Sequence, residues 1–124
     1  MDVLVPQEIL DKLFPEDHEL GEESMFLSKC KEINRWGLPK DRVIIQSTHH
    51  IYMLNAKEVT KKIPIIDLKY YIKSTLSNEL LLFFDDDSDL RLIFDEREEM
   101  LSYMKMRFAN LAPKKSLAVY GVPQ

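Results

Sequence analysis

Four basic residues flank one short loop, and their spacing gives them the clearest chemical potential in the sequence. Lys29 and Lys31 precede the loop, and Lys40 and Arg42 follow it. Side chains two residues apart in a β-strand share a face, so each pair points one way. We expect an antiparallel hairpin to bring both pairs to one opening between its two strands. Their cations would converge there on phosphate oxygens, which Arg42 can bind bidentately.

Further bases and two apolar residues surround this predicted opening. Lys57, Lys61 and Lys62 belong to the next predicted hairpin. They would form a rim and attract an anionic membrane, at about 1 kcal/mol per base near the surface. Trp36 and Leu38 stand in the first loop. A tryptophan flanked by bases suits a membrane interface, so we predict a membrane-contact loop. The alternative is that Trp36 folds back onto the sheet.

Charge is segregated along the chain, although its formal total is only -4. Residues 1–24 contain eight acids and one lysine, whereas residues 25–75 contain ten bases and four acids. Residues 76–99 contain nine acids and two arginines, and the remainder adds four bases and no acid. A mildly acidic total therefore permits a basic face.

Enzyme chemistry has little support in the sequence. His18, His49 and His50 form no helical metal-binding motif, and Cys30, the single cysteine, has no partner at zinc spacing. Alternation makes Cys30 a core residue rather than a nucleophile. The acids at 85–87 lack the alternate spacing and glycine of a calcium loop. We predict a non-catalytic protein without a metal or another cofactor.

Length and composition indicate one folded globular domain of 124 residues, with 45% apolar and 31% charged residues. A single cysteine excludes an intrachain disulfide and suits a reducing compartment. No apolar run approaches the roughly 18–20 residues of a membrane span, and no basic signal-peptide start is visible. We expect a cytoplasmic protein that is peripheral to the membrane.

Seven short strands are predicted between residues 25 and 94. Val, Ile, Tyr, Phe and Leu fill them, and turn-forming residues separate them. The predicted strands are 25–33, 42–47, 50–54, 60–64, 68–74, 79–84 and 89–94.

Two helices are predicted outside the strands. An apolar stripe predicts a short amphipathic helix over 7–14, followed by an acidic loop. At the other end, Asp95 and Glu98 have the spacing of a capping pair. Leu101, Met104, Phe108 and Leu111 then form one apolar stripe, which Pro113 terminates. The tail beyond it is apolar enough to dock as a strand or to continue into more protein.

Seven antiparallel strands followed by one helix favour two near-orthogonal sheets whose open end the helix fills. This order resembles a pleckstrin-homology-like domain, and in particular the tail-homology domain of class I myosins. The resemblance covers about residues 25–108. It is carried by Lys31-Glu32-Ile33-Asn34-Arg35, Arg42-Val43-Ile44-Ile45, Ile51-Tyr52-Met53-Leu54, Lys61-Lys62-Ile63-Pro64-Ile65, Leu76-Ser77-Asn78-Glu79-Leu80 and Asp89-Leu90-Arg91-Leu92-Ile93-Phe94.

The resemblance implies a mainly β fold: a seven-stranded barrel or sandwich capped by a C-terminal helix, here with a short N-terminal helix. We divide the chain into an extension (1–24), the domain (25–112) and a tail (113–124). The resemblance also implies a membrane-targeting module in which Lys29, Lys31, Lys40 and Arg42 bind a phosphoinositide or another acidic phospholipid headgroup.

A protein-interaction or scaffold module of a larger cytoskeletal or kinase-bearing protein is the alternative function. It would use the groove between the fifth strand and the helix, or the apolar tail over 117–122. Tyr70, Tyr71 and Tyr103 would supply aromatic contacts. Nucleic acid is not an expected partner, because the basic region lacks a recognition helix and the terminal helix begins with acids.

Overall fold

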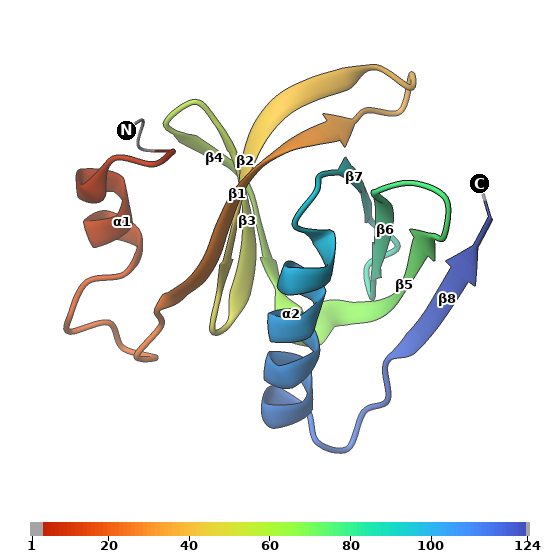
Figure 1. Cartoon of the computed structure of the whole chain (residues 1–124). Helices are drawn as coiled ribbons and strands as arrows, with labels where there is room; N and C mark the ends of the chain where they lie inside the picture. The colour runs from red at the N-terminus through yellow and green to blue at the C-terminus, as the bar shows by residue number, and fades with distance from the viewer. Residues whose placement is uncertain (1–3, 124) are drawn as a thin grey trace.

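A computed structural model describes residues 4–123 as a β-sheet with two α-helices (Figure 1). The sheet has eight strands in the order β4-β3-β2-β1-β7-β6-β5-β8. The fold class predicted from the sequence is confirmed, with an eighth strand added. The elements are α1 (Gln7–Leu13), β1 (Ser24–Ile33), β2 (Pro39–Ser47), β3 (His50–Asn55), β4 (Glu58–Pro64), a 3-10 turn η1 (Ile65–Asp67), β5 (Leu68–Ser74), β6 (Glu79–Phe84), β7 (Asp89–Ile93), α2 (Arg97–Leu111) and β8 (Ala118–Val122).

The sheet consists of two halves that meet at a narrow joint. β1 to β4 form consecutive antiparallel pairs, and so do β5 to β7. The halves are connected where Lys31 pairs with Ile93 and Glu32 pairs with Leu92. The sequence predicted two near-orthogonal sheets, and this contact between β1 and β7 joins the two halves into one hydrogen-bonded sheet.

Helix α2 fills the core between the two halves, as its apolar stripe predicted. Leu101, Met104 and Phe108 are buried in the main core cluster. The capping pair predicted at its start is wrong. Glu96 occupies the N-cap position without a side-chain cap, and the Asp95 carboxylate instead accepts a hydrogen bond from the Asn78 amide at 2.9 Å. The acids of this turn therefore bind neighbouring elements rather than the helix's own N–H groups.

Helix α1 covers the outer face of the β1–β4 half-sheet. A second apolar cluster forms there around Val5, Ile45, Tyr52 and Leu54. The Phe14 ring meets the Tyr52 ring edge-on, with 5.6 Å between their centroids. The N-terminal extension is therefore packed against the domain.

The C-terminal tail adds β8 to the edge of the other half-sheet. β8 runs parallel to β5, with Tyr70 opposite Ala118 and Ile72 opposite Tyr120. Docking of the tail as a strand was one of the two predicted possibilities. Tyr71 is fully buried. It therefore cannot act as the surface aromatic contact that the protein-binding alternative assigned to it.

Candidate anion-binding surface

The loop between β1 and β2 holds its apolar residues away from the sheet. The Asn34 side-chain oxygen accepts hydrogen bonds from the backbone N–H groups of Trp36 at 3.0 Å and Leu38 at 2.9 Å. Gly37 adopts φ +79°, a conformation that glycine tolerates best. Trp36 is 70% exposed and Leu38 is 54% exposed. The alternative in which Trp36 folds back onto the sheet is therefore wrong.

The Arg35 guanidinium stacks over the Trp36 ring, 4.2 Å from its centroid. This cation–π contact keeps a positive charge beside an exposed indole. The tip of the hairpin therefore combines a large apolar surface with a base.

The four bases of the predicted opening lie on opposite faces of the hairpin. Lys29 pairs with Val43, and Lys31 pairs with Asp41. Residues directly opposite each other in an antiparallel pair point to the same face. Lys29 and Lys31 consequently share the outer face, whereas Lys40 and Arg42 lie opposite Glu32 and Cys30 on the inner face. The prediction that the two pairs converge on one opening is wrong, because the register separates them.

The outer face carries a partly neutralised pair of lysines. The Lys31 ammonium forms an exposed ion pair with Asp41. A hydrogen bond from Lys31, together with its charge, holds the pKa of the Asp41 carboxyl below its ordinary value of 3.8. The Lys29 ammonium has no hydrogen-bond or ion-pair partner among residues 4–123. Lys29 is therefore the cation of this face that is available to an external anion.

The inner face brings Arg42 and Lys61 to one carboxylate, that of Glu32, and Lys40 is opposite Glu32 in the strand register. Glu32 Oε1 lies 3.5 Å from Arg42 Nε, and Glu32 Oε2 lies 2.6 Å from Lys61 Nζ. The Glu32 side chain is 14% exposed and that of Arg42 is 21% exposed. Sequence reasoning missed Glu32, although alternation from the core residue Cys30 places it on the inner face.

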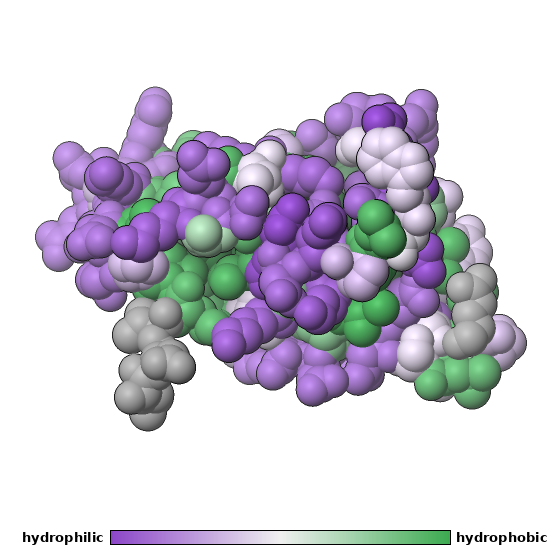
Figure 2. Space-filling model, turned by 90° about the horizontal axis from the view of Figure 1, so that it is seen from above, coloured by the Kyte–Doolittle hydropathy of each residue, from purple (hydrophilic) through white to green (hydrophobic). Residues whose placement is uncertain are grey.

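Lys57 and Lys62 extend the basic surface along the second hairpin. Lys57 is exposed in the turn between β3 and β4. Lys62 lies opposite Tyr52, with its ammonium 5.9 Å from the ring centroid. The loops β1/β2 and β3/β4 both project at the top of Figure 1. Figure 2 looks down on this end and shows a mainly hydrophilic surface with local hydrophobic patches.

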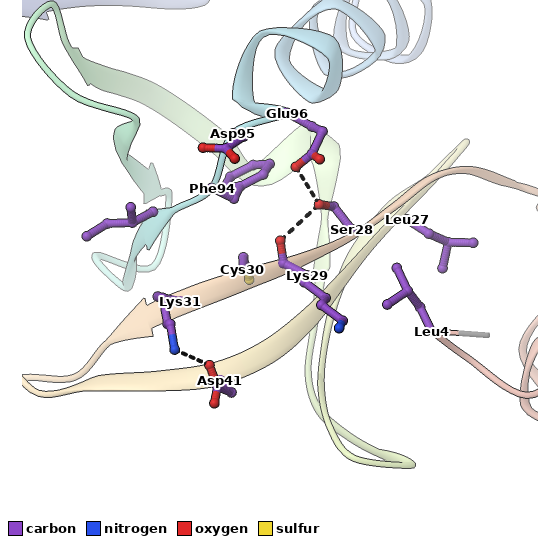
Figure 3. A pocket seen from close by; sticks show the side chains of 11 residues that line it. Leu4, Leu27, Ser28, Lys29, Cys30, Lys31, Asp41, Phe94, Asp95 and Glu96 are labelled. Carbon is purple, nitrogen blue, oxygen red and sulfur yellow. Dashed lines mark hydrogen bonds and ion pairs between the residues drawn. The ribbon is translucent and has the colours of Figure 1, made fainter. Parts of the chain in front are cut away.

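The cavities on this side of the molecule contain charges of both signs. An open pocket of about 520 Å³ follows β1 beside the start of α2. In Figure 3, Asp95 and Glu96 lie on one side of the β1 ribbon, and the side chains of Lys29 and Lys31 project from the other. A smaller pocket of about 350 Å³ is lined by Lys29 and Arg42, but also by Asp41. The bases therefore form a surface with acids interspersed rather than a purely basic cavity.

A buried acid near the β2/β3 turn was also missed. The Glu22 side chain is fully buried, and its Oε2 accepts hydrogen bonds from Ser47, His50 and Tyr52. His18 Nε2 lies 3.2 Å from Glu22 Oε1. No sequence motif marks this cluster, because its members come from a loop and two strands. It anchors the segment after α1 to the sheet.

Cys30 is a core residue, as predicted, with 6% exposure. Burial and the nearby Glu32 carboxylate raise the pKa of its thiol to about 12. A thiol of this kind is unreactive at neutral pH. Within residues 4–123, no group of three or more His, Cys, Asp or Glu side chains is arranged to hold a metal ion. None of the described helices is long and apolar enough to cross a membrane.

Comparison with known proteins identifies the architecture. No protein-family model and no curated protein sequence match the chain. Solved structures with a similar fold do match it. The N-terminal PH domain of human ARAP2 superposes with a TM-score of 0.62 at 9% identity, covering 73% of this chain and 84% of that domain. The fold is that of a pleckstrin-homology domain.

Two further structures agree with this assignment. The C-terminal PH domain of pleckstrin gives a TM-score of 0.60 at 13% identity, over 68% of this chain and 96% of that one. The C-terminal domain of an unknown protein from Leishmania infantum gives 0.64 at 17% identity, over 82% and 96% respectively. At these identities the likeness establishes the pleckstrin-homology fold alone.

Proposed function

We propose that this pleckstrin-homology-like domain is a non-catalytic module that binds acidic phospholipid headgroups at a membrane surface. The observation that carries the proposal is the β1/β2 tip, where Trp36 is 70% exposed. The same hairpin bears Lys29, Lys40 and Arg42. In this proposal Trp36 and Leu38 enter the membrane interface. The bases beside them bind phosphate oxygens. Indole rings commonly lie at the membrane interface, and basic side chains commonly contact anionic headgroups there.

The position of the two hairpin tips supports this orientation. The β1/β2 and β3/β4 loops project together at the top of Figure 1, and the acidic loop between α1 and β1 lies away from them at the lower left. The bases on these two hairpins would then face an anionic leaflet together. Lys57, Lys61 and Lys62 would contribute long-range attraction. Such a module would act in the cytoplasm, peripheral to the membrane.

The sequence similarity to the tail-homology domain of class I myosins also favours acidic-lipid binding. It stays a prediction, because no family model matches the chain. The inner and outer faces of the hairpin would contact different headgroups, since the register separates their bases. Lys31 is held by Asp41, so Lys29 would contribute more than Lys31 on the outer face.

Trp36 is the only tryptophan in the chain, so its fluorescence tests the proposal directly. We expect its emission to shift to the blue with vesicles that contain phosphatidylglycerol, but not with pure phosphatidylcholine vesicles. Higher salt should weaken the binding, because it screens exposed charges. Lys40→Ala combined with Arg42→Ala should reduce vesicle binding by about 2 kcal/mol at low salt.

Lys12→Ala combined with Lys114→Ala is the matched control, because it removes two exposed bases from α1 and the tail. It should leave most of the binding intact. Equal losses in the two double variants would mean that only net charge matters. An unshifted Trp36 emission with anionic vesicles would contradict the proposed function.

A protein-binding module is the second candidate, and the exposed edge strand β8 favours it. Val119 is 45% exposed and Tyr120 is 52% exposed on that strand. An apolar edge strand readily pairs with another chain. The groove next to β5 is less available, because β8 already pairs with β5.

A further inference from the structure

We propose that Glu32 is an internal counter-ion at the inner-face bases, and that a phosphomonoester group must displace it in order to bind. This inference rests on the proposed function and names the headgroup chemistry of that same surface. The phosphomonoester can belong to a lipid headgroup or to a free phosphate ester, and the experiment below separates these sources.

The Glu32 carboxylate already occupies the position that a bound anion would take. Its two oxygens contact cations from two different strands, Arg42 on β2 and Lys61 on β4. Arg42 Nε makes no hydrogen bond among the described residues, although it lies 3.5 Å from Glu32. Lys40 is directly opposite Glu32 on the same face and has no ion-pair partner between residues 4 and 123. Two cations therefore share one carboxylate, and Lys40 lies on the same face without an ion pair to it.

This arrangement leaves unused binding capacity. Two cations contact one carboxylate of charge -1, Lys40 lies beside them unpaired, and the buried Arg42 Nε–H has no hydrogen-bond acceptor among the described residues. Lys61 is 44% exposed, so solvent weakens its attraction to Glu32 and permits exchange. The contacts given for the Glu32 carboxylate are these two ion pairs, and displacement by another anion would break both of them.

Charge decides which anion can replace Glu32. A phosphomonoester carries about -1.5 to -2 charges at pH 7 and three acceptor oxygens. It can contact Arg42, Lys61 and Lys40 together, which the carboxylate does not do. A phosphodiester carries one charge, as the carboxylate does, and so it gains little by displacing Glu32. The inner face should consequently prefer phosphomonoester lipids over diester lipids at equal surface charge.

The test compares Glu32→Gln with Asp41→Asn. Both variants remove one acid from the same hairpin, and both acids pair with a lysine, but Asp41 lies on the outer face. The probes are vesicles containing phosphatidylinositol 4-phosphate or phosphatidylglycerol, matched in surface charge. The wild-type protein should prefer phosphatidylinositol 4-phosphate. Glu32→Gln should tighten binding to phosphatidylglycerol by about fivefold, as expected for one net charge near the surface, and should narrow that preference.

Asp41→Asn should tighten binding to both vesicles equally and leave the preference unchanged. Soluble inositol 1,4-bisphosphate distinguishes the source of the phosphate. A gain in Glu32→Gln with this probe would assign the exchange to the phosphate group itself, and a gain on vesicles alone would assign it to a lipid headgroup. Thermal unfolding verifies that each variant is folded.

A triple variant tests whether the effect of Glu32→Gln depends on Arg42 and Lys61. Glu32→Gln should no longer narrow the headgroup preference when Arg42→Ala and Lys61→Ala are already present, because the two cations that Glu32 pairs with are then missing. Loss of its negative charge should then tighten binding to both vesicles equally. The inference is overturned if the preference still narrows in that background, or if Glu32→Gln and Asp41→Asn have the same effect on headgroup preference. If Trp36 emission stays unshifted with every vesicle in both wild type and Glu32→Gln, the proposed function itself is wrong.

Discussion

Glu22 is a carboxylate that is fully buried and yet charged. Burial raises its pKa, but hydrogen bonds from Ser47, His50 and Tyr52, together with the charge of His50, outweigh this effect. The net result is a pKa below the ordinary value of 4.5. Ionised Glu22 is therefore more stable in the folded protein than in the unfolded chain, and it contributes stability at neutral pH.

We predict that Glu22→Gln lowers the free energy of unfolding by about 1–3 kcal/mol at pH 7, because charge-assisted hydrogen bonds to a buried group are lost. A depressed folded-state pKa stabilises the protein above about pH 4.5, and this contribution disappears as the pH falls through the folded-state pKa. Urea unfolding measured from pH 7 to pH 3 should show the difference between variant and wild type shrinking below pH 4.5.

Tyr52→Phe provides the control for this network, because it removes one donor to Glu22 and keeps the ring that packs on Phe14. A double-mutant cycle should give a coupling free energy between Glu22 and Tyr52. Strictly additive effects, or a loss that does not change with pH, would show that the carboxylate is not the stabilising group.

Predictions for single residues succeeded where strand alternation alone determines the face on which a side chain lies. Cys30 follows strand alternation into the core. Asp41 points away from Lys40 and Arg42, as alternation requires. Glu32 could not be recognised as a bridging acid, because its partner Lys61 lies 29 residues away on β4. Contacts of this kind depend on which strands become neighbours.

The elements were predicted more accurately than their register. The predicted ranges of β5 and β6 match the structure, and the remaining strands differ by a few residues at their ends. The faces of the β1/β2 hairpin depend on the loop, where Ile33 pairs with Pro39. A shift of one residue would have placed Lys29 opposite Arg42, as the single predicted opening required. The turn at Asn34 and Gly37, together with the burial of Cys30 and Ile44 on the inner face, fixes this choice.

The β1/β2 loop therefore makes a prediction at the scale of the element. Asn34→Ala removes the acceptor for the N–H groups of Trp36 and Leu38. We expect faster amide exchange at these two positions, a loss of about 1 kcal/mol in stability, and weaker vesicle binding. Asn34→Asp is the matched control, since it retains a side-chain acceptor. Unchanged exchange in Asn34→Ala would show that the loop does not depend on this side chain.

At the scale of the whole molecule, the two ends of the chain pack on different half-sheets. The extension packs α1 on the outer face of one half-sheet, and the tail adds β8 at the edge of the other. Beside β8, an open groove of about 480 Å³ is lined by Tyr70, Ile72, Tyr120 and Val122. The sequence indicated that the extension and the tail are apolar enough to dock. It did not indicate where, because docking depends on surfaces created by the fold.

We predict that removing residues 114–124 destabilises the protein and promotes self-association, because β5 then becomes an uncovered edge strand. Analytical ultracentrifugation and thermal unfolding would measure both effects. Vesicle binding should persist, since the inner and outer bases lie on the other half-sheet. A partner protein whose capture requires the tail but survives Lys40→Ala with Arg42→Ala would favour the protein-binding alternative.

The joint between the half-sheets has a mechanical consequence. Backbone pairing connects the two halves at Lys31 with Ile93 and at Glu32 with Leu92. The domain thus consists of two half-sheets joined by a short pairing of β1 with β7, with α2 packed between them. A small change in the angle between the two half-sheets would leave nearly all hydrogen bonds between strands intact, because, among the strands of residues 4–123, only the β1–β7 pairing crosses the joint. Glu32 belongs to this short pairing. A change in its ion pairs with Arg42 and Lys61 would therefore act directly at the point where the two half-sheets meet.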